Sequence, residues 1–318
     1  MGKRGKGPLR AVALAVTAAS MTLVPSLGLA AFTALGAALQ ATPAGASTAP
    51  TAPTPPTPPT AVEYYLDLGG SASVGFQPTA IRPDGQPTDT GYANDLLSSE
   101  RARWHGLQLV QFGCPGETTW SFMGGGDRCR PAGQTQMAEA VAFLRAHPDT
   151  VLVTIDLGFN DIDRCLAFHT VNEACLAARL DLIDEQLPAI LARLRAAAGP
   201  SVRFVGVGHY DPYLGDYLHG GPAVDFAQDS VAAIAGLDET LHDIYSDAGV
   251  PMANVGQAFE MTHSEPVDLA GVGDVPTNVQ RTCVLTWMCT SASPRAKQHP
   301  NDAGYQVIAQ AIAAAVPG

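Results

Sequence analysis

The segment TVLVTIDL, at residues 150–157, constrains the fold most, because its apolar residues do not alternate with polar ones and so leave neither face suited to contact with solvent. A strand of a parallel sheet is buried on both faces and reads as a continuous apolar run of this kind. Similar runs alternate along the chain with longer segments whose apolar residues have helical spacing, which predicts an α/β fold with an α/β/α three-layer, parallel, doubly wound sheet. Strands are expected at 62–68, 107–112, 150–157, 202–207 and 251–255, and helices at 95–104, 134–146, 176–198, 225–248 and 303–315, with a kink or break at Pro188.

The amino-terminal segment has the composition of an export signal. MGKRGKGPLR carries four basic residues and no acidic one, and an apolar run follows to about Gln40. This order predicts a signal peptide at 1–46, with cleavage after Ala44-Gly45-Ala46. The apolar run is also long enough to cross a bilayer, so an uncleaved membrane anchor is the alternative. Either way, the protein is expected to be secreted or held at the cell surface.

Residues 47–61 consist almost wholly of Thr, Pro and Ala, which favours an extended linker without a core of its own. The remaining residues, 62–318, are enough for one packed domain. The net charge of the chain is −12, and removing the four basic residues of the signal leaves −16. An acidic surface of this kind argues against nucleic acid and anionic membranes as partners.

Six cysteines follow the predicted signal, and an even number in an exported chain indicates disulfides. Six cysteines allow fifteen pairings, but the short spacings favour three local ones. These join Cys114 to Cys129, Cys165 to Cys175, and Cys283 to Cys289. A zinc site is the alternative, but the chain has no C-x-x-C pair and no histidine at ligand spacing, so no metal is predicted.

Four short motifs fall where a parallel sheet places its binding sites, at the carboxyl ends of strands and at the entry to the last helix. Taken singly, Ser71 would be a turn residue, Asn160 a strand-end or capping residue and His299 part of a helix start. Their order along the chain is what distinguishes them from these structural roles. The motifs are GGS at 69–71, GCPGETT at 113–119, GFND at 158–161 and HPNDAGY at 299–305.

Together these motifs resemble those of the SGNH (GDSL-type) hydrolases, esterases and lipases with a flavodoxin-like three-layer fold. The resemblance runs from about Tyr64 to Ala313 and is closest to the exported, disulfide-containing branch of actinobacteria, where GCPGETT and a W-M-C segment recur. It implies a nucleophile at Ser71 and a general base at His299. It also implies an oxyanion hole made of the backbone N–H groups of Ser71 and Gly116 and the side-chain amide of Asn160.

The chemistry requires these residue types. A serine hydroxyl is a weak nucleophile until a neutral imidazole removes its proton, and the tetrahedral oxyanion needs preformed hydrogen-bond donors. An α/β-hydrolase would also use serine and histidine, but its G-x-S-x-G elbow is missing, since Ser73 stands where the second glycine belongs.

Two positions depart from the family pattern. Gly70 replaces the usual aspartate beside the nucleophile, and Ala296 stands where the acid of a triad belongs, three residues before His299. The first departure predicts a loosely held serine loop, which Gly70→Asp would order, with a gain in kcat, unless the neighbouring backbone has adapted to glycine. The second predicts a dyad whose histidine is oriented by a backbone carbonyl.

The sequence therefore predicts a monomeric, secreted serine esterase or lipase that hydrolyses lipid-type or small acyl esters through an acyl-serine, without metal or organic cofactor. Two alternatives stay open: an acetylesterase acting on acetylated polysaccharide, and a degenerate member that binds an ester or glycan without turnover. His209 follows a predicted strand at the same sheet edge, where it could contact substrate.

Overall fold

The computed structural model describes residues 61–318, apart from Gly125 and Asp127. The predicted signal peptide at 1–46 and all but the last residue of the predicted linker at 47–61 lie outside this part, so both stay predictions. Among the described helices, none combines the length and the apolar character needed to cross a membrane.

Five parallel strands form the central sheet, which confirms the predicted α/β class. Their order is β2-β1-β3-β6-β7, so the chain adds β2 on one side of β1 and then crosses to add β3 on the other. This is the flavodoxin-like order, whose topological switch point lies between the first and third strands. The strands are β1 (Glu63–Gly69), β2 (Leu107–Gln111), β3 (Thr150–Asp156), β6 (Arg203–Val207) and β7 (Met252–Ala253).

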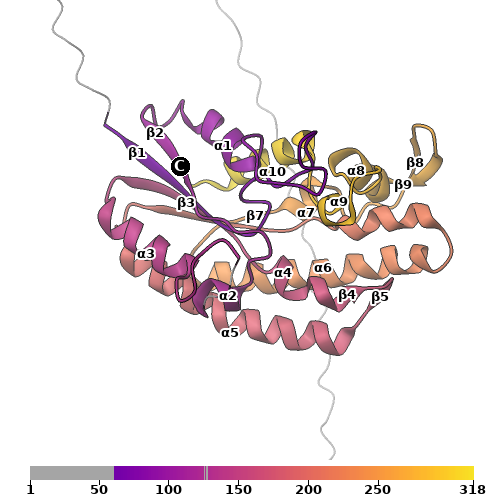
Figure 1. Cartoon of the computed structure of the whole chain (residues 1–318), viewed down its shortest axis with the longest axis horizontal. Helices are drawn as coiled ribbons and strands as arrows, with labels where there is room; N and C mark the ends of the chain where they lie inside the picture. Colours follow the sequence, from indigo (N-terminus) through magenta and orange to yellow (C-terminus); the bar gives the residue numbers. More distant parts are fainter. Residues whose placement is uncertain (1–60, 125, 127) are drawn as a thin grey trace, which may run out of the picture. The chain divides into compact units, whose positions relative to one another are not determined.

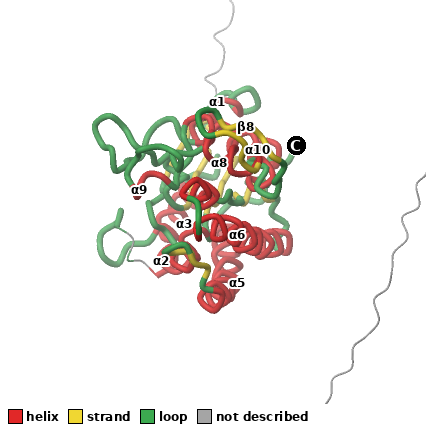
Figure 2. The backbone as a smooth tube through the Cα atoms, turned by 90° about the vertical axis from the view of Figure 1, so that its right-hand side faces the viewer, coloured by secondary structure: helices red, strands yellow, loops and turns green. Residues whose placement is uncertain are grey.

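Helices cover both faces of the sheet, as Figures 1 and 2 show. One layer contains α3 (Gln136–Ala146), α5 (Glu173–Ala197) and α6 (Pro222–Asp247), and the other contains α1 (Tyr92–Glu100) and α10 (Asp302–Ala315). Successive side chains of β1 point to opposite layers: Leu66 and Leu68 pack with the α3, α5 and α6 cluster, whereas Tyr65 packs with α1 and α10. Because both faces are buried, the strands have the continuous apolar sequences from which they were predicted.

Of the two predicted alternatives at Pro188, a kink or a break, the break is wrong, since α5 runs without interruption from Glu173 to Ala197. A proline inside a helix leaves the carbonyl four residues earlier without its donor. Pro188 and Asp184, whose carbonyl is the one left free, both lie on the exposed side of the helix, where water can satisfy it.

Several short elements between the main ones were too brief for periodicity to predict. Two antiparallel hairpins are formed by β4 (Leu166–Ala167) with β5 (Thr170–Val171), and by β8 (Pro266–Leu269) with β9 (Gly273–Pro276). The short helices are α2 (Thr119–Gly124), α4 (Phe159–Ile162), η1 (Asp163–Cys165), η2 (Pro212–His219), α7 (Val255–Ala258), α8 (Thr277–Leu285) and α9 (Pro294–Lys297).

Three disulfides join Cys114 to Cys129, Cys165 to Cys175, and Cys283 to Cys289, the pairs that the sequence spacings favour.

Candidate active site

The loop after β1 begins with a glycine that no other residue could replace. Gly69 has a φ of +140°, and a Cβ at this position would lie 2.2 Å from the carbonyl oxygen of Asp156 in β3. The next residue, Gly70, donates its N–H to that same carbonyl at 3.0 Å. The chain then turns, with Phe76 N–H donating to the Ser71 carbonyl at 3.1 Å and Ser73 Oγ donating to the Gly70 carbonyl at 2.9 Å. The turn holds Ser71 at the switch point between β1 and β3.

Ser71 and His299, 228 residues apart in sequence, meet at this sheet edge. The Nε2 atom of His299 lies 2.8 Å from Ser71 Oγ, and its Nδ1 atom lies 3.2 Å from the carbonyl oxygen of Ala296. A carbonyl can only accept, so the proton of the neutral ring resides on Nδ1 and the lone pair of Nε2 faces the serine. The backbone carbonyl of Ala296 therefore orients His299, a task that a carboxylate performs in a triad.

The backbone around His299 is fixed on both sides. Its N–H donates to the Ala296 carbonyl at 3.2 Å, and its carbonyl accepts from Trp287 N–H at 3.1 Å. Trp287 lies in the loop that the Cys283–Cys289 disulfide closes. Asn301 caps α10 by accepting from Gly304 N–H at 3.1 Å, so the helix begins three residues after the histidine.

Burial lowers the pKa of His299 to about 4, and the positive charge of Arg295 adds to this effect. The hydrogen bond to Ala296 acts in the opposite direction. The imidazole is therefore neutral at neutral pH, which is the state that can accept a proton from Ser71.

Three hydrogen-bond donors converge beside Ser71. Among the described residues, none accepts from the backbone N–H of Ser71 or Gly116, and the Gly116 backbone is exposed. The Nδ2 atom of Asn160 donates to the Glu117 carbonyl at 3.0 Å, which holds the amide close to Gly70. Both N–H groups are thus free to donate to a ligand, and they line the cavity beside the reactive hydroxyl, where an anionic oxygen could accept from them.

Asp161 joins the loops that carry two of these donors. Its carboxylate accepts from the backbone N–H of Thr119 at 3.0 and 3.2 Å and from the Thr119 hydroxyl at 2.7 Å. The GFND loop after β3 is thereby tied to the GETT end of the loop after β2. Asp161 thus positions Asn160 and Gly116 relative to each other.

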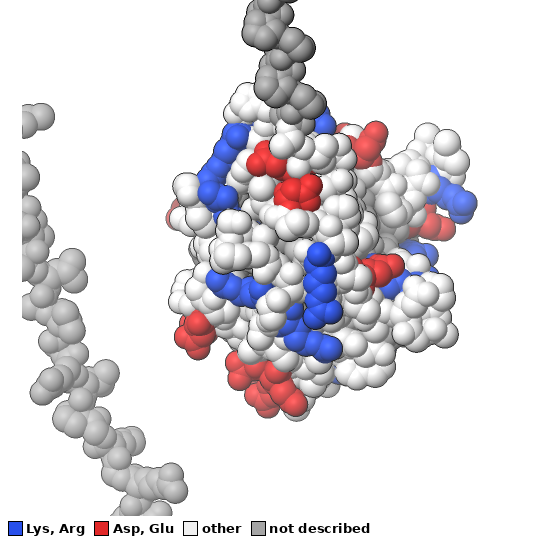
Figure 3. Space-filling view, turned by 90° about the vertical axis from the view of Figure 1, so that its left-hand side faces the viewer, with Lys and Arg blue, Asp and Glu red and all other residues white. Residues whose placement is uncertain are grey.

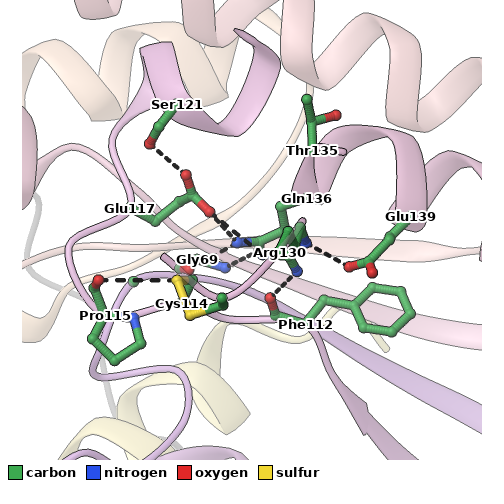
Figure 4. Close-up of polar contacts among 12 residues, drawn as sticks. Gly69, Phe112, Cys114, Pro115, Glu117, Ser121, Arg130, Thr135, Gln136 and Glu139 are labelled. Atoms are coloured by element: carbon green, nitrogen blue, oxygen red, sulfur yellow. Dashed lines mark hydrogen bonds and ion pairs between the residues drawn. A yellow bond between two sulfur atoms is a disulfide. The ribbon is translucent and has the colours of Figure 1, made fainter. Parts of the chain in front are cut away.

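A buried polar network behind the serine loop involves residues that the sequence did not single out (Figure 4). The side-chain amide of Gln136 accepts from the Gly69 N–H at 2.7 Å and donates to the Gly69 carbonyl at 3.1 Å. The same amide donates to Glu117 Oε2 at 2.8 Å, and Arg130 approaches that oxygen at 3.8 Å. Ser121 donates to the other carboxylate oxygen of Glu117. Gln136 therefore fixes the end of β1, from which the serine loop starts. This contact supports the loop even though Gly70 has no carboxylate to do so.

A cavity of about 560 Å³ opens over Ser71, His299 and the three donors. Asp156 and His209 form part of its wall, with His209 Nδ1 3.8 Å from Asp156 Oδ1 and His209 Nε2 3.2 Å from the Leu157 carbonyl. Burial raises the pKa of Asp156 to about 7 and lowers that of His209 to about 4. His209 thus lies at the cavity as a neutral, buried side chain.

A group of side chains with possible metal ligands lies apart from Ser71. The ligand atoms of His169, Asp216 and His219 all fall within 4.8 Å of one another, and His219 Nδ1 lies 3.4 Å from Asp216 Oδ1. His169 and Asp216 line a separate cavity of about 270 Å³. No sequence pattern marks this group, because His169 lies in the turn of the β4–β5 hairpin and the other two residues lie on η2.

Comparison with known proteins agrees with the fold and with the family that the sequence resembles. The sequence profile described as the GDSL-like lipase/acylhydrolase family matches residues 68–307. No curated protein sequence matches the chain. An extracellular lipase from Streptomyces rimosus is similar in structure, with a TM-score of 0.50 and 18% identity, covering 80% of this chain and 100% of that one.

A second solved structure, the lipase Lip_vut3 from a goat rumen metagenome, gives a TM-score of 0.50 and 15% identity, covering 80% of this chain and 97% of its own. At these identities the likeness concerns the fold. The profile match extends over most of the chain and spans the segments that bring Ser71 and His299 together. The chain belongs to the GDSL-like lipase/acylhydrolase family.

Proposed function

We propose that this protein is an exported serine esterase that hydrolyses carboxylic esters through an acyl intermediate on Ser71. The observation that carries the proposal is the contact of 2.8 Å between Ser71 Oγ and the unprotonated Nε2 of His299. Serine becomes a competent nucleophile when a neutral base accepts its proton in this way.

In the proposed reaction, Ser71 Oγ attacks the ester carbonyl carbon while its proton passes to His299 Nε2. The carbonyl oxygen becomes an oxyanion and accepts hydrogen bonds from Ser71 N–H, Gly116 N–H and Asn160 Nδ2. The bond to the alcohol then breaks, and the alcohol leaves with the proton from His299. A water next loses its proton to His299 and attacks the acyl carbon, and Ser71 departs with that proton. Removing one oxyanion donor of this kind typically lowers kcat by about 10² to 10³.

Export is supported by the three disulfides and by the composition of the amino-terminal segment. Disulfides persist in oxidising compartments and are rare in the cytosol. We therefore assign 1–46 to a signal peptide, 47–61 to a linker and 62–318 to the catalytic domain, which we expect to act as a monomer.

The test is hydrolysis of a p-nitrophenyl ester series from acetate to palmitate by the oxidised protein. Ser71→Ala and His299→Ala should each remove nearly all activity, whereas Ser246→Ala and His263→Ala, at exposed positions, serve as matched controls and should retain it. A serine-directed phosphonate should label Ser71 alone.

The chain-length profile separates the candidate substrates. Activity with longer acyl chains supports a lipase, and activity confined to acetate supports an acetylesterase on acetylated polysaccharide. No activity above the Ser71→Ala variant, or phosphonate labelling at Ser73 or Ser121, would overturn the assignment and favour a non-catalytic binding protein.

A further inference from the structure

Basic side chains gather at the cavity that contains Ser71 and His299. Four arginines line it, and they come from four segments: the loop after α2, η1, α5 and α9. The chain after residue 10 contains only 14 Lys and Arg against 30 Asp and Glu, so this gathering opposes the overall charge balance. On the side of the molecule at the amino ends of the strands, by contrast, basic and acidic residues are interspersed (Figure 3). The four arginines are Arg128, Arg164, Arg179 and Arg295.

These four guanidinium groups are available to a ligand. All four residues are exposed, and within 61–124, 126 and 128–318 none of them has a carboxylate within 4.0 Å. By contrast, Arg130 pairs with Glu139 at 2.6 Å and Arg281 pairs with Glu260 at 3.4 Å. Other exposed arginines, such as Arg193, also lack a carboxylate partner among the described residues, so what distinguishes the four is that they line one cavity.

Three aspartates also line the cavity and offset part of this charge, since the Asp161 carboxylate interacts electrostatically with Arg179, but their oxygens are less accessible to a ligand than the four guanidinium groups. Asp161 accepts three hydrogen bonds from Thr119, and Asp163 accepts from the Tyr213 hydroxyl at 2.7 Å and from Gln298 at 3.3 Å. Asp156 lies beneath the cavity with only 7% of its surface exposed. The accessible charge at the opening is thus positive.

Disulfides anchor the backbones from which three of these arginines extend. Arg128 precedes Cys129, and Arg164 precedes Cys165, whose partner Cys175 lies four residues, or about one turn, before Arg179 on α5. The arginine side chains can change rotamer while the disulfides hold the backbone from which they extend. Such an arrangement preserves the spacing of the backbone positions from which the charges extend.

We propose that this cavity selects esters that carry an anionic group near the scissile bond, and that Arg164 and Arg179, aided by Arg128 and Arg295, bind that group. The proposal rests on the esterase function proposed above. A guanidinium presents a planar fork of donors that matches a carboxylate or a phosphate. The anion has two possible sources: the free carboxylate of a dicarboxylic acid monoester, or the phosphate of a phospholipid headgroup.

The experiment compares each anionic substrate with a neutral one of the same acyl length. The carboxylate pair is monoethyl adipate against ethyl hexanoate, followed by ethanol release. The phosphate pair is 1-oleoyl lysophosphatidic acid against 1-oleoylglycerol in mixed micelles, followed by oleate release. We expect kcat/KM for the anionic member to exceed that of the neutral one about tenfold in at least one pair at low salt. The preference should shrink in 0.5 M NaCl, because exposed charges are screened beyond a few ångströms at that ionic strength.

Two variants test the residues. The double variant R164Q/R179Q should lower the ratio of anionic to neutral kcat/KM about fivefold or more. Arg193→Gln is the matched control, since Arg193 is exposed on the same helix α5 but does not line the cavity, and the ratio should stay unchanged.

A ratio at or below one in both pairs overturns the proposal, as does an unchanged ratio in R164Q/R179Q or an equal fall in Arg193→Gln. Hydrolysis of neutral esters without any anion preference would refute this inference alone. Absence of hydrolysis of every substrate, p-nitrophenyl esters included, would refute the esterase function and this inference with it.

Discussion

A methyl group at position 70 should impair catalysis without impairing folding. A Cβ built on Gly70 lies 2.8 Å from Asn160 Nδ2, the proposed oxyanion donor. Carbon and nitrogen atoms pack at about 3.5 Å, so in Gly70→Ala the amide must retreat by about 0.7 Å. Loss of a whole donor lowers kcat by about 10² to 10³, and a displaced donor loses part of that. We therefore expect kcat to fall about tenfold in Gly70→Ala, with KM changed much less.

Stability should respond differently. The φ of Gly70 lies outside the left-handed region, so alanine fits the backbone without strain. A compatible Gly→Ala change stabilises by about 0.4–1 kcal/mol through the unfolded state, which offsets the local crowding. The free energy of unfolding in urea should therefore stay within about 1 kcal/mol of the parent. Gly236→Ala, in α6 with no atom within 4 Å of the added carbon, is the control and should leave kcat unchanged.

A double-mutant cycle identifies the route of the effect. Asn160→Ala removes the amide, so adding Gly70→Ala to it should cause no further loss of kcat. An equal loss in both backgrounds, or a gain in kcat for Gly70→Ala, would refute the reasoning. The same contact reverses the expectation that the sequence suggested for Gly70→Asp. The space for a side chain is taken by Asn160, and we now expect the aspartate to lower kcat.

Three further outcomes are expected. Because burial lowers the pKa of His299 to about 4, kcat/KM should rise through pH 4 and be level from about pH 6 upward. A midpoint of the pH profile near 6.5, or a decline in kcat/KM by pH 7, would contradict this. Gln136→Ala leaves the Gly69 N–H without its acceptor, although the Gly69 carbonyl still accepts from Cys114 N–H, and it should reduce the free energy of unfolding by about 1–3 kcal/mol and lower kcat. The exposed Gln134→Ala should do neither, and equal effects of the two variants would contradict the role of the network. Replacing Cys114 and Cys129 by serine should reduce the free energy of unfolding by about 3 kcal/mol, and peptide mapping that joins Cys114 to any other cysteine would disprove the pairing.

The strands and the Ser–His pair were accessible to sequence reasoning for a physical reason. Strands buried on both faces are continuously apolar, and their carboxyl ends must share one edge of the sheet. Motifs at those ends, such as GGS and GFND, could therefore be placed together although they are far apart in the chain. The sequence left a kink or a break open at Pro188, because the outcome depends on whether water can reach the carbonyl that the proline leaves free.

The supporting residues of the site escaped sequence reasoning because they act through tertiary contacts. Gln136 stands at the start of a helix, 67 residues from the Gly69 that it binds, and no local pattern marks it. The arginines around the cavity are single residues in unrelated segments, and only the folded chain reveals that Arg164 and Arg179 share a cavity. The backbone-carbonyl acceptor of His299, by contrast, was predicted from the missing triad acid, and the structure identifies it as the Ala296 carbonyl.

The arrangement of the disulfides has a consequence for how the chain is made. Each bridge joins neighbouring cysteines in sequence order, with separations of 15, 10 and 6 residues. In the export that we propose, which would proceed from the amino terminus, both members of one pair emerge before the first member of the next. Oxidation in order of emergence therefore yields the native pairs directly, and biogenesis should depend on an oxidase and little on disulfide isomerisation.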